Sequence, residues 1–431
     1  MQEYEINQKG NFCVGGADVT ELAQRYGTPL YVYDENVVRG SIRAFKKSME
    51  DNYDGNGMVL YASKAFSCKE IYRIAQSEGI GADVVSAGEL YTALSAGFSP
   101  ENIFFHGNNK TQEEIEFAVK NNVGCFVVDN IFELKSLSRI AEQYNKRVRI
   151  MFRIKPGIDA HTHDFVRTGQ IDSKFGFALE TGEAKQAVLQ ALSGEYPGIE
   201  LIGLHCHIGS QIFDVDPFCL AAEVMLDFMI EMKKETGVTL GELNLGGGFG
   251  IRYTDDDSPR PYGEYMGSVS KVIKNKCLEC GFPTPKIYIE PGRSIIAQAG
   301  TTLYKVGAVK NIPNVRTYVS IDGGMVDNPR YILYGSKYDL LIANKASQQK
   351  SDIVTVAGKC CESGDLIQEN VKLQPVEVGD ILAVLATGAY NYSMASNYNR
   401  ICRPAAVMVK DGQARVIIKR ESFEDLVRND V

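Results

Sequence analysis

Four groups of residues in this 431-residue chain have side chains or a backbone suited to catalysis, and each group ends or follows a short apolar run. They are Lys64, the pair His205 and His207, the glycine triplet 246–248, and Glu290 with Arg293. A lysine, a glycine triplet and a carboxylate at separate strand ends would supply an amine nucleophile, an anion cradle and a charge partner. The pattern predicts covalent chemistry on a small molecule that carries an anionic group.

Lys64 is the candidate nucleophile, because it follows the run GMVLYA after a single serine. Most lysines in most proteins are solvated at the surface, and that remains the alternative here. A lysine enclosed at the mouth of a barrel, however, has a lowered pKa and can form a Schiff base with an aldehyde cofactor. We therefore expect Lys64 to hold such a cofactor.

The glycine triplet lies in LNLGGGFG, at 243–250. Without a Cβ, its backbone N–H groups can approach a phosphate closely. The spacing matches neither G-x-x-x-x-G-K-[ST] nor G-x-G-x-x-G, which disfavours ATP and dinucleotides. A tight strand-to-helix turn without a ligand is the alternative.

Histidine pairs leave a metal site open as a second interpretation. His205 with His207, and His161 with His163, both form H-x-H, a spacing found in metal-dependent barrel hydrolases. That interpretation leaves Lys64 and the glycines unexplained, so no metal is predicted. The one C-x-x-C pair, 277–280, is better explained by a helix that ends before Gly281.

Eight short apolar runs alternate with helical periodicity between Val37 and Gly292. Their ranges are 57–62, 79–85, 103–107, 124–129, 148–154, 201–207, 242–248 and 286–290. Eight such units predict an α/β fold, a (β/α)8 TIM-type barrel over residues 37–285, with its active site at the carboxyl ends of the strands. A helix through Met225 and Met232 is expected to end at Gly237. The long connection 155–176 is expected to be functional.

Period-2 runs separated by Gly, Pro, Asn and Asp take over after the barrel. They predict a mainly β C-terminal domain, a sandwich or a barrel, over residues 286–431. The early extended run 29–34 predicts that the N-terminal segment 1–36 joins this domain.

Composition restricts the possible partners and the compartment. The net charge is -8 and no Lys/Arg run occurs, which disfavours nucleic acid and anionic membrane. Ten irregularly spaced cysteines are typical of a reduced compartment. The sequence shows neither signal-peptide features nor a membrane span, so we expect a cytoplasmic enzyme with a small-molecule substrate.

Longer motifs extend this interpretation over nearly the whole chain. They are YASK, GADVVSAGEL, HGNNK, SKFGF, HCHIGSQ, LNLGGGFG, EPGRS, DGGM, GKCCESGD and TGAYNYSMASNYN. On these motifs the chain resembles the diaminopimelate decarboxylases, pyridoxal phosphate enzymes of the alanine-racemase-like barrel group.

The resemblance implies a site for pyridoxal 5'-phosphate. Lys64 would hold it as a Schiff base, His207 would stack on its ring and Glu290 would pair with the ring nitrogen. The full set of implied cofactor contacts is Lys64, Asp83, His207, Ser210, Gly247, Gly248, Glu290, Gly292, Arg293 and Tyr390.

The resemblance also implies a substrate, meso-2,6-diaminopimelate, decarboxylated at its D-centre to L-lysine. The implied substrate contacts are Arg293, Arg330, Tyr334, Glu362 and Tyr390. Cys361 would give the proton to the substrate carbon and would come, with Glu362, from a partner subunit, so the active unit would be a homodimer. Without the resemblance, Cys361 is explained equally well as a small buried hydrophobe.

Two departures from the family pattern and three other functions stay open. Tyr331 and Cys402 stand where proline is usual, and Tyr331 adjoins Arg330. A related decarboxylase would act on a carrier-tethered glutamyl group or a polyamine precursor, although two guanidinium groups disfavour a diamine precursor. A racemase would lack the CESGD and TGAY motifs. An inactive regulatory relative would have lost Lys64, Glu290 or Cys361, and all three are present.

Overall fold

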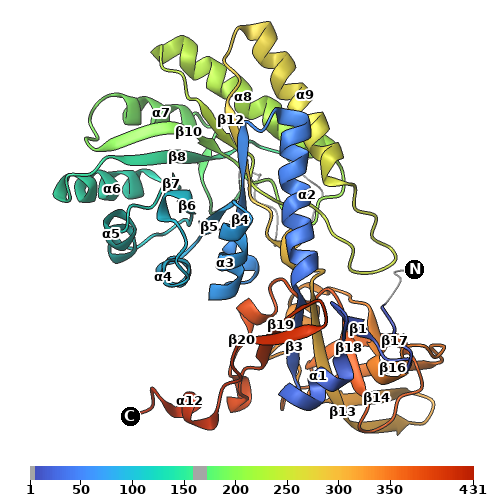
Figure 1. Ribbon diagram of the computed structural model, residues 1–431. Helices are drawn as coiled ribbons and strands as arrows, with labels where there is room; N and C mark the ends of the chain where they lie inside the picture. The colour runs from blue at the N-terminus through green and yellow to red at the C-terminus, as the bar shows by residue number, and fades with distance from the viewer. Residues whose placement is uncertain (1–4, 159–171) are drawn as a thin grey trace. The chain divides into compact units, whose positions relative to one another are not determined.

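The computed structural model describes residues 5–158 and 172–431, which divide into two units (Figure 1). The first unit comprises 1–40, 251–258 and 295–431, and the second comprises 41–250 and 259–294. Each unit contains a β-sheet of its own, and the predicted site residues are divided between the two.

Eight parallel strands form a closed barrel in the second unit, as the sequence predicts. Their order is β4-β5-β6-β7-β8-β10-β11-β12, and β12 pairs with β4 to close the ring. The strands are β4 (Gly57–Ala62), β5 (Gly81–Val84), β6 (Ile103–Phe105), β7 (Cys125–Val128), β8 (Val148–Lys155), β10 (Ile199–His205), β11 (Glu242–Asn244) and β12 (Lys286–Ile289). A short strand, β9 (Phe177–Ala178), pairs with the end of β8.

The barrel strands are nearly continuous apolar runs because side chains on both of their faces are buried. Leu60, Phe104, Val127 and Met151 belong to one buried cluster contributed by different strands. Helices cover the outside of the barrel (Figure 1). They are α2 (Glu35–Tyr53), α3 (Lys69–Ser77), α4 (Ala87–Ser95), α5 (Gln112–Lys120), α6 (Ile131–Gln143), α7 (Glu183–Leu192), α8 (Asp216–Thr236) and α9 (Tyr262–Cys280).

Local signals fix where these helices begin and end. Ser86, Thr111 and Asn130 each accept a hydrogen bond from the backbone N–H three residues later, which satisfies a free donor of the first turn. Gly237 and Gly281 end α8 and α9 in the left-handed conformation, as the sequence predicts. The C-x-x-C pair therefore lies in the last turn of α9.

The first unit is built around a second sheet with the order β17-β16-β14-β13-β3-β19-β20, while β18 pairs with both β13 and β15. Its strands are β3 (Leu30–Asp34), β13 (Gly300–Ile312), β14 (Arg316–Ile321), β15 (Leu340–Ile342), β16 (Asp352–Ala357), β17 (Leu366–Leu373), β18 (Ile381–Val384), β19 (Ala405–Lys410) and β20 (Gln413–Ile418). Strand β3 of the N-terminal segment pairs with β13 and β19. Smaller elements are β1 (Cys13–Val14), β2 (Ala17–Asp18), α1 (Val19–Tyr26), α10 (Arg293–Ile296), α11 (Arg330–Tyr334) and α12 (Phe423–Val427).

The end of the barrel lies later than the expected boundary at residue 285. Strand β12 occupies 286–289 and pairs with β4 and β11, so without it the barrel would remain open. The barrel unit therefore continues to Ser294.

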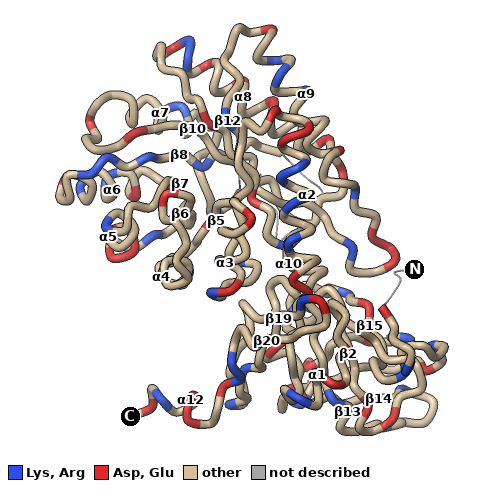
Figure 2. The backbone as a smooth tube through the Cα atoms, viewed as in Figure 1, with Lys and Arg blue, Asp and Glu red and all other residues tan. Residues whose placement is uncertain are grey.

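Basic and acidic residues are interspersed along the backbone of both units (Figure 2). Within residues 5–158 and 172–431, no helix combines the length and hydropathy that crossing a membrane requires.

We expect Gly203→Ala to destabilise the barrel. Gly203 pairs with Glu242 between neighbouring strands, and an added Cβ would collide with the carbonyl oxygen of Glu242. Overpacking of this kind costs about 1–3 kcal/mol, which urea unfolding measures. Gly241→Ala is the matched control, since nothing lies near its Cβ position. Equal stability of the two variants would contradict the prediction.

Candidate active site

Glu290 is the centre of a buried polar cluster at the carboxyl ends of the barrel strands. His106, His205 and Asn244 follow or end three different strands and all contact its carboxylate. His106 Nε2 lies 2.8 Å from Oε1 and His205 Nε2 lies 3.2 Å from Oε2. The Asn244 side-chain amide donates to Oε1 at 2.6 Å. Both carboxylate oxygens are thus held by side chains from separate strands.

This cluster keeps Glu290 ionised. Burial opposes ionisation, but the contacts of the carboxylate with His106 and His205 outweigh it, and the pKa of Glu290 lies well below its usual range. Burial lowers the pKa of His205 to about 4, against the opposing effect of Glu290. At neutral pH the centre is therefore a carboxylate, and the neutral imidazole of His205 donates its Nε2 proton to it.

Asp83 on β5 has the opposite electrostatic environment. Its carboxyl group is buried, with Oδ1 lacking a hydrogen-bond partner. Burial first, and then the negative charge of Glu290, raise the pKa of Asp83 to about 6. The barrel mouth thus holds two carboxyl groups whose environments shift their pKa values in opposite directions, a feature typical of functional sites.

His205 and His207 have separate partners, although they form one H-x-H motif. Strand β10 ends at His205, which contacts Glu290, whereas His207 lies beyond the strand and its Nδ1 accepts a hydrogen bond from the backbone N–H of Gly247 at 3.3 Å. Burial, followed by the charges of Lys64 and Arg153, holds the pKa of His207 well below its usual range. The His207 ring is therefore neutral, with its proton on Nε2.

The glycines at the barrel mouth lie too close to neighbouring segments for larger residues to fit. A Cβ on Gly247 would collide with the carbonyl oxygen of Glu290, and one on Gly248, where φ is +110°, with that of Gly209. A Cβ on Gly292 would lie 2.8 Å from Ala62 Cβ. The glycines are therefore required by backbone packing, and the same absence of side chains leaves the backbone open to an anion.

A cation lies beside this glycine region. Arg293 is buried and donates from Nη2 to Ser210 Oγ at 3.0 Å. A guanidinium and a serine hydroxyl are standard partners of phosphate. Lys64 lies in a 3-10 turn directly after β4 and its side chain is exposed, so the single chain does not enclose this lysine as was expected from the sequence.

Three ligand atoms of His106, His205 and Glu290 lie within 4.8 Å of one another, a spacing that a metal ion would fit. Only His205 of the H-x-H pair that motivated the metal interpretation belongs to this set, because His207 has another partner. His161 and His163 lie outside the described residues. The imidazole nitrogens here contact the carboxylate itself, which provides an explanation of the cluster without an ion.

The sequence analysis did not identify the partners of Glu290. His205 was among the candidate residues, but its contact with Glu290 was not predicted, and His106 and Asn244 were not among the predicted site residues. The available signal was position: each of the three lies at the carboxyl end of a barrel strand.

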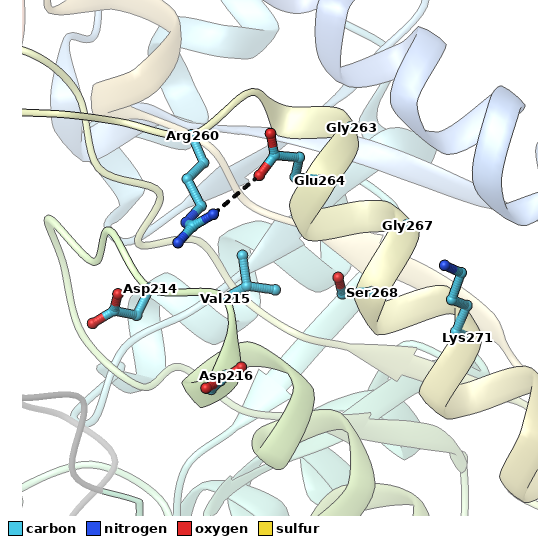
Figure 3. Close-up of a pocket in the computed structure, with 9 residues that line it drawn as sticks. All are labelled: Asp214, Val215, Asp216, Arg260, Gly263, Glu264, Gly267, Ser268 and Lys271. Atoms are coloured by element: carbon cyan, nitrogen blue, oxygen red, sulfur yellow. Dashed lines mark hydrogen bonds and ion pairs between the residues drawn. The ribbon is translucent and has the colours of Figure 1, made fainter.

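A separate cavity of about 480 Å³ lies on the barrel unit, between the starts of α8 and α9 (Figure 3). Exposed charged side chains line it, including Asp214, Asp216 and Lys271, and an ion pair between Arg260 and Glu264 spans 3.3 Å. It contains none of the predicted site residues, so it is distinct from the Glu290 cluster.

The first unit holds the remaining predicted residues in two groups. In one, the buried guanidinium of Arg330 lies 4.8 Å from the ring centre of Tyr334 and 5.4 Å from that of Tyr390. Its Nη2 is 3.5 Å from Ser336 Oγ, and no described carboxylate lies within ion-pair distance. Arg330 is thus a buried cation available for an anionic group of a ligand.

The other group is an exposed loop with Cys361 and Glu362. The Cys361 N–H donates to Asn399 Oδ1 at 2.7 Å, and the Tyr398 hydroxyl donates to Glu362 Oε2 at 3.4 Å. At the base of the loop, the buried carboxylate of Asp365 accepts from the N–H of Cys360 at 2.8 Å. This loop therefore presents a thiol and a carboxylate on a fixed backbone.

Comparison with known families defines the class. The family model "Pyridoxal-dependent decarboxylase, pyridoxal binding domain" matches residues 38–297, which include the whole barrel. Fold, strand-end residues and this match together define a pyridoxal-dependent barrel decarboxylase.

Relatives over the full chain narrow the assignment. The chain is 50% identical to a diaminopimelate decarboxylase of Halalkalibacterium halodurans, over 99% of this chain and 96% of the relative. It is 48% identical to that of Bacillus subtilis, over 99% and 96%. A crystal structure of the diaminopimelate decarboxylase of M. jannaschii with L-lysine matches with a TM-score of 0.90 at 36% identity, covering 100% and 98% of the two chains. The chain belongs to the diaminopimelate decarboxylase family.

The residues present fit pyridoxal phosphate, the cofactor of this class. An exposed lysine amine lies at one strand end, an ionised carboxylate at another, and a glycine region with Arg293 and Ser210 suits a phosphate. The buried Asp83 Oδ1 has no hydrogen-bond partner among the described residues. The donor set thus supplies a partner for the aldehyde, the ring nitrogen and the phosphate.

We expect Asp83→Asn to stabilise the apoprotein at neutral pH. The folded pKa of about 6 exceeds the unfolded value of roughly 3.9, so ionisation of Asp83 costs more free energy in the folded protein than in the unfolded chain. Stability is therefore lost as the pH rises from about 4 to about 6, whereas below about pH 4 both states are protonated and nothing is lost. The variant should gain up to about 2 kcal/mol at pH 7, with no gain near pH 4. Urea unfolding across this range measures it, with the exposed Asp214→Asn as control. A gain independent of pH would exclude this cause.

Proposed function

We propose that this protein decarboxylates meso-2,6-diaminopimelate at its D-centre and releases L-lysine and CO2, with pyridoxal phosphate as cofactor. The observation that carries the proposal is the ionised Glu290, held by His106, His205 and Asn244 in the barrel that holds Lys64. The family membership and the lysine complex of the M. jannaschii relative support it.

Several residues of the barrel would hold the cofactor. Lys64 would bind its aldehyde carbon, His207 would lie against the ring, and Ser210, Gly247, Gly248, Gly292 and Arg293 would receive the phosphate. Asp83, on β5, and Tyr390, in the first unit, would also contact the cofactor. When bound, pyridoxal phosphate supplies an electron sink for the carbanion left when CO2 departs.

Glu290 keeps a proton on the ring nitrogen, because a carboxylate with a very low pKa pairs best with a cationic partner. The histidines and Asn244 prevent Glu290 from taking that proton, since they stabilise its charged form. His207 stays neutral and serves as a flat surface for the ring.

The substrate has charges at both ends, and the first unit offers matching groups. Arg330 receives the distal carboxylate, and Glu362 receives the distal ammonium group. Tyr334 and Tyr390, whose rings flank the Arg330 guanidinium, restrict its orientation. Arg293 adds a second cation. A polyamine precursor with a terminal ammonium would be repelled by Arg330.

Cys361 donates the proton that replaces CO2 on the substrate carbon. Cys361 and Glu362 are exposed in the single chain, as residues that complete the site of a partner subunit would be. The active unit is a homodimer, and its location is cytoplasmic.

The first test is the visible spectrum of the protein with pyridoxal phosphate, followed by assay of lysine and CO2 after addition of meso-diaminopimelate. We expect a Schiff-base absorbance band and lysine release, and Lys64→Ala should lose both because it removes the amine. A band without turnover of diaminopimelate would redirect the search to a carrier-tethered glutamyl group or another amino acid. No band in the wild type would refute both cofactor and reaction.

Shared active sites are tested by mixing two inactive variants. Lys64→Ala and Cys361→Ala, unfolded and refolded together, should recover roughly a quarter of wild-type activity, because half of the dimers are mixed and each has one intact site. Each variant refolded alone is the control. No recovery, with mixed dimers demonstrated by mass, would show that Cys361 acts within its own chain.

A further inference from the structure

Helix α11, which carries Arg330 and Tyr334, is too short to be stable by itself. It has five residues between Pro329 and Gly335, and nucleation of so short a helix is unfavourable in water. Its apolar residues do not anchor it, since Ile332 and Leu333 are 37% and 49% exposed. The position of α11 must therefore depend on contacts with the rest of the first unit.

Tyr331 provides such a contact. Its hydroxyl donates to Glu369 Oε2 on β17 at 3.0 Å. Glu369 is fixed in turn by Arg316 on β14, whose Nη1 donates to Oε1 at 2.6 Å. The hydrogen-bonded chain Tyr331–Glu369–Arg316, here called the Tyr331 tether, joins α11 to two strands of the sheet.

The tether is a charge-assisted connection. Hydrogen bonds from Arg316 first, and then from Tyr331, lower the pKa of Glu369, so this side chain accepts as a carboxylate at neutral pH. Hydrogen bonds to a charged acceptor are stronger than those between neutral groups. The Arg316 guanidinium also lies 5.7 Å from the ring centre of Tyr318.

Arg330 depends on α11 for its position. Of its contacts, Tyr334 belongs to the same helix and Ser336 lies two residues after its end, so both depend on the position of the helix, whereas Tyr390 lies elsewhere in the unit. Adjacent helical residues point about 100° apart. A tether at Tyr331 therefore fixes the rotation of α11, and with it the direction of the neighbouring guanidinium.

We propose that Tyr331 is a positioning residue that sets the affinity for the substrate's distal carboxylate, by tethering α11 through Glu369 and thereby orienting Arg330. The assignment rests on the proposed function.

The test is steady-state decarboxylation of meso-diaminopimelate by Tyr331→Phe, which removes only the hydroxyl. KM should rise about three- to tenfold, while kcat stays within about twofold of the wild type. Glu369→Gln should act in the same way, and the double variant should raise KM no further than the stronger single variant. The Ki of L-lysine, which keeps the distal carboxylate, should rise in parallel, and that of cadaverine, which lacks it, should not.

Tyr26→Phe is the matched control, since it removes a partly buried hydroxyl that bonds Ala414 O at 3.3 Å elsewhere in the unit. The neighbouring segment has its own anchor, because the Tyr338 N–H donates to Gln368 Oε1 at 2.9 Å. A KM change no larger than that of Tyr26→Phe would overturn the tether. So would a loss of kcat accompanied by a loss of thermal stability. Either result would leave the proposed reaction intact. A wild type that releases no lysine would overturn the proposed function and the tether together.

Discussion

The carboxylate of Glu290 is the interaction on which the rest of the barrel site depends. A buried carboxylate is normally protonated, and this one stays ionised because His106, His205 and Asn244 surround its two oxygens. Its negative charge also raises the pKa of Asp83. One desolvated charge thus determines the proton positions on its neighbours, and a cofactor ring whose nitrogen must stay protonated requires such a charge.

The barrel makes this arrangement possible because parallel strands end on one side. Residues that are distant in the sequence meet there, while the strand interiors remain apolar and rigid. The glycines follow from the same constraint. Where the loops after β10, β11 and β12 converge, backbone atoms approach so closely that a Cβ would collide with a carbonyl oxygen. The absence of side chains at these glycines therefore permits both the close packing of the backbone and access for an anion.

Under the proposed function, the first unit has a different task, the recognition of charged groups of the substrate. Arg330 is buried against two tyrosine rings without a carboxylate among the described residues to neutralise it. Such a guanidinium favours a ligand with an anionic end, and how well it binds that ligand depends on the direction in which it points. Direction is set by the short helix α11 and by its hydrogen bond to the sheet. Under the proposed function, substrate specificity then rests on residues that position Arg330 as well as on the groups that contact the substrate.

The sequence by itself determined the elements of the barrel, because a period of two and apolar runs are local properties. It also determined Lys64, the glycine triplet and Glu290 as candidates, since each follows a strand. It predicted helix ends at Gly237 and Gly281 correctly, because a left-handed residue favours glycine. Only the tertiary structure decided which histidines meet Glu290, why His205 and His207 separate, and that the barrel unit ends at Ser294 and not at residue 285. These features depend on contacts between residues tens to hundreds of positions apart in the sequence. A local sequence pattern does not indicate which of these residues come into contact.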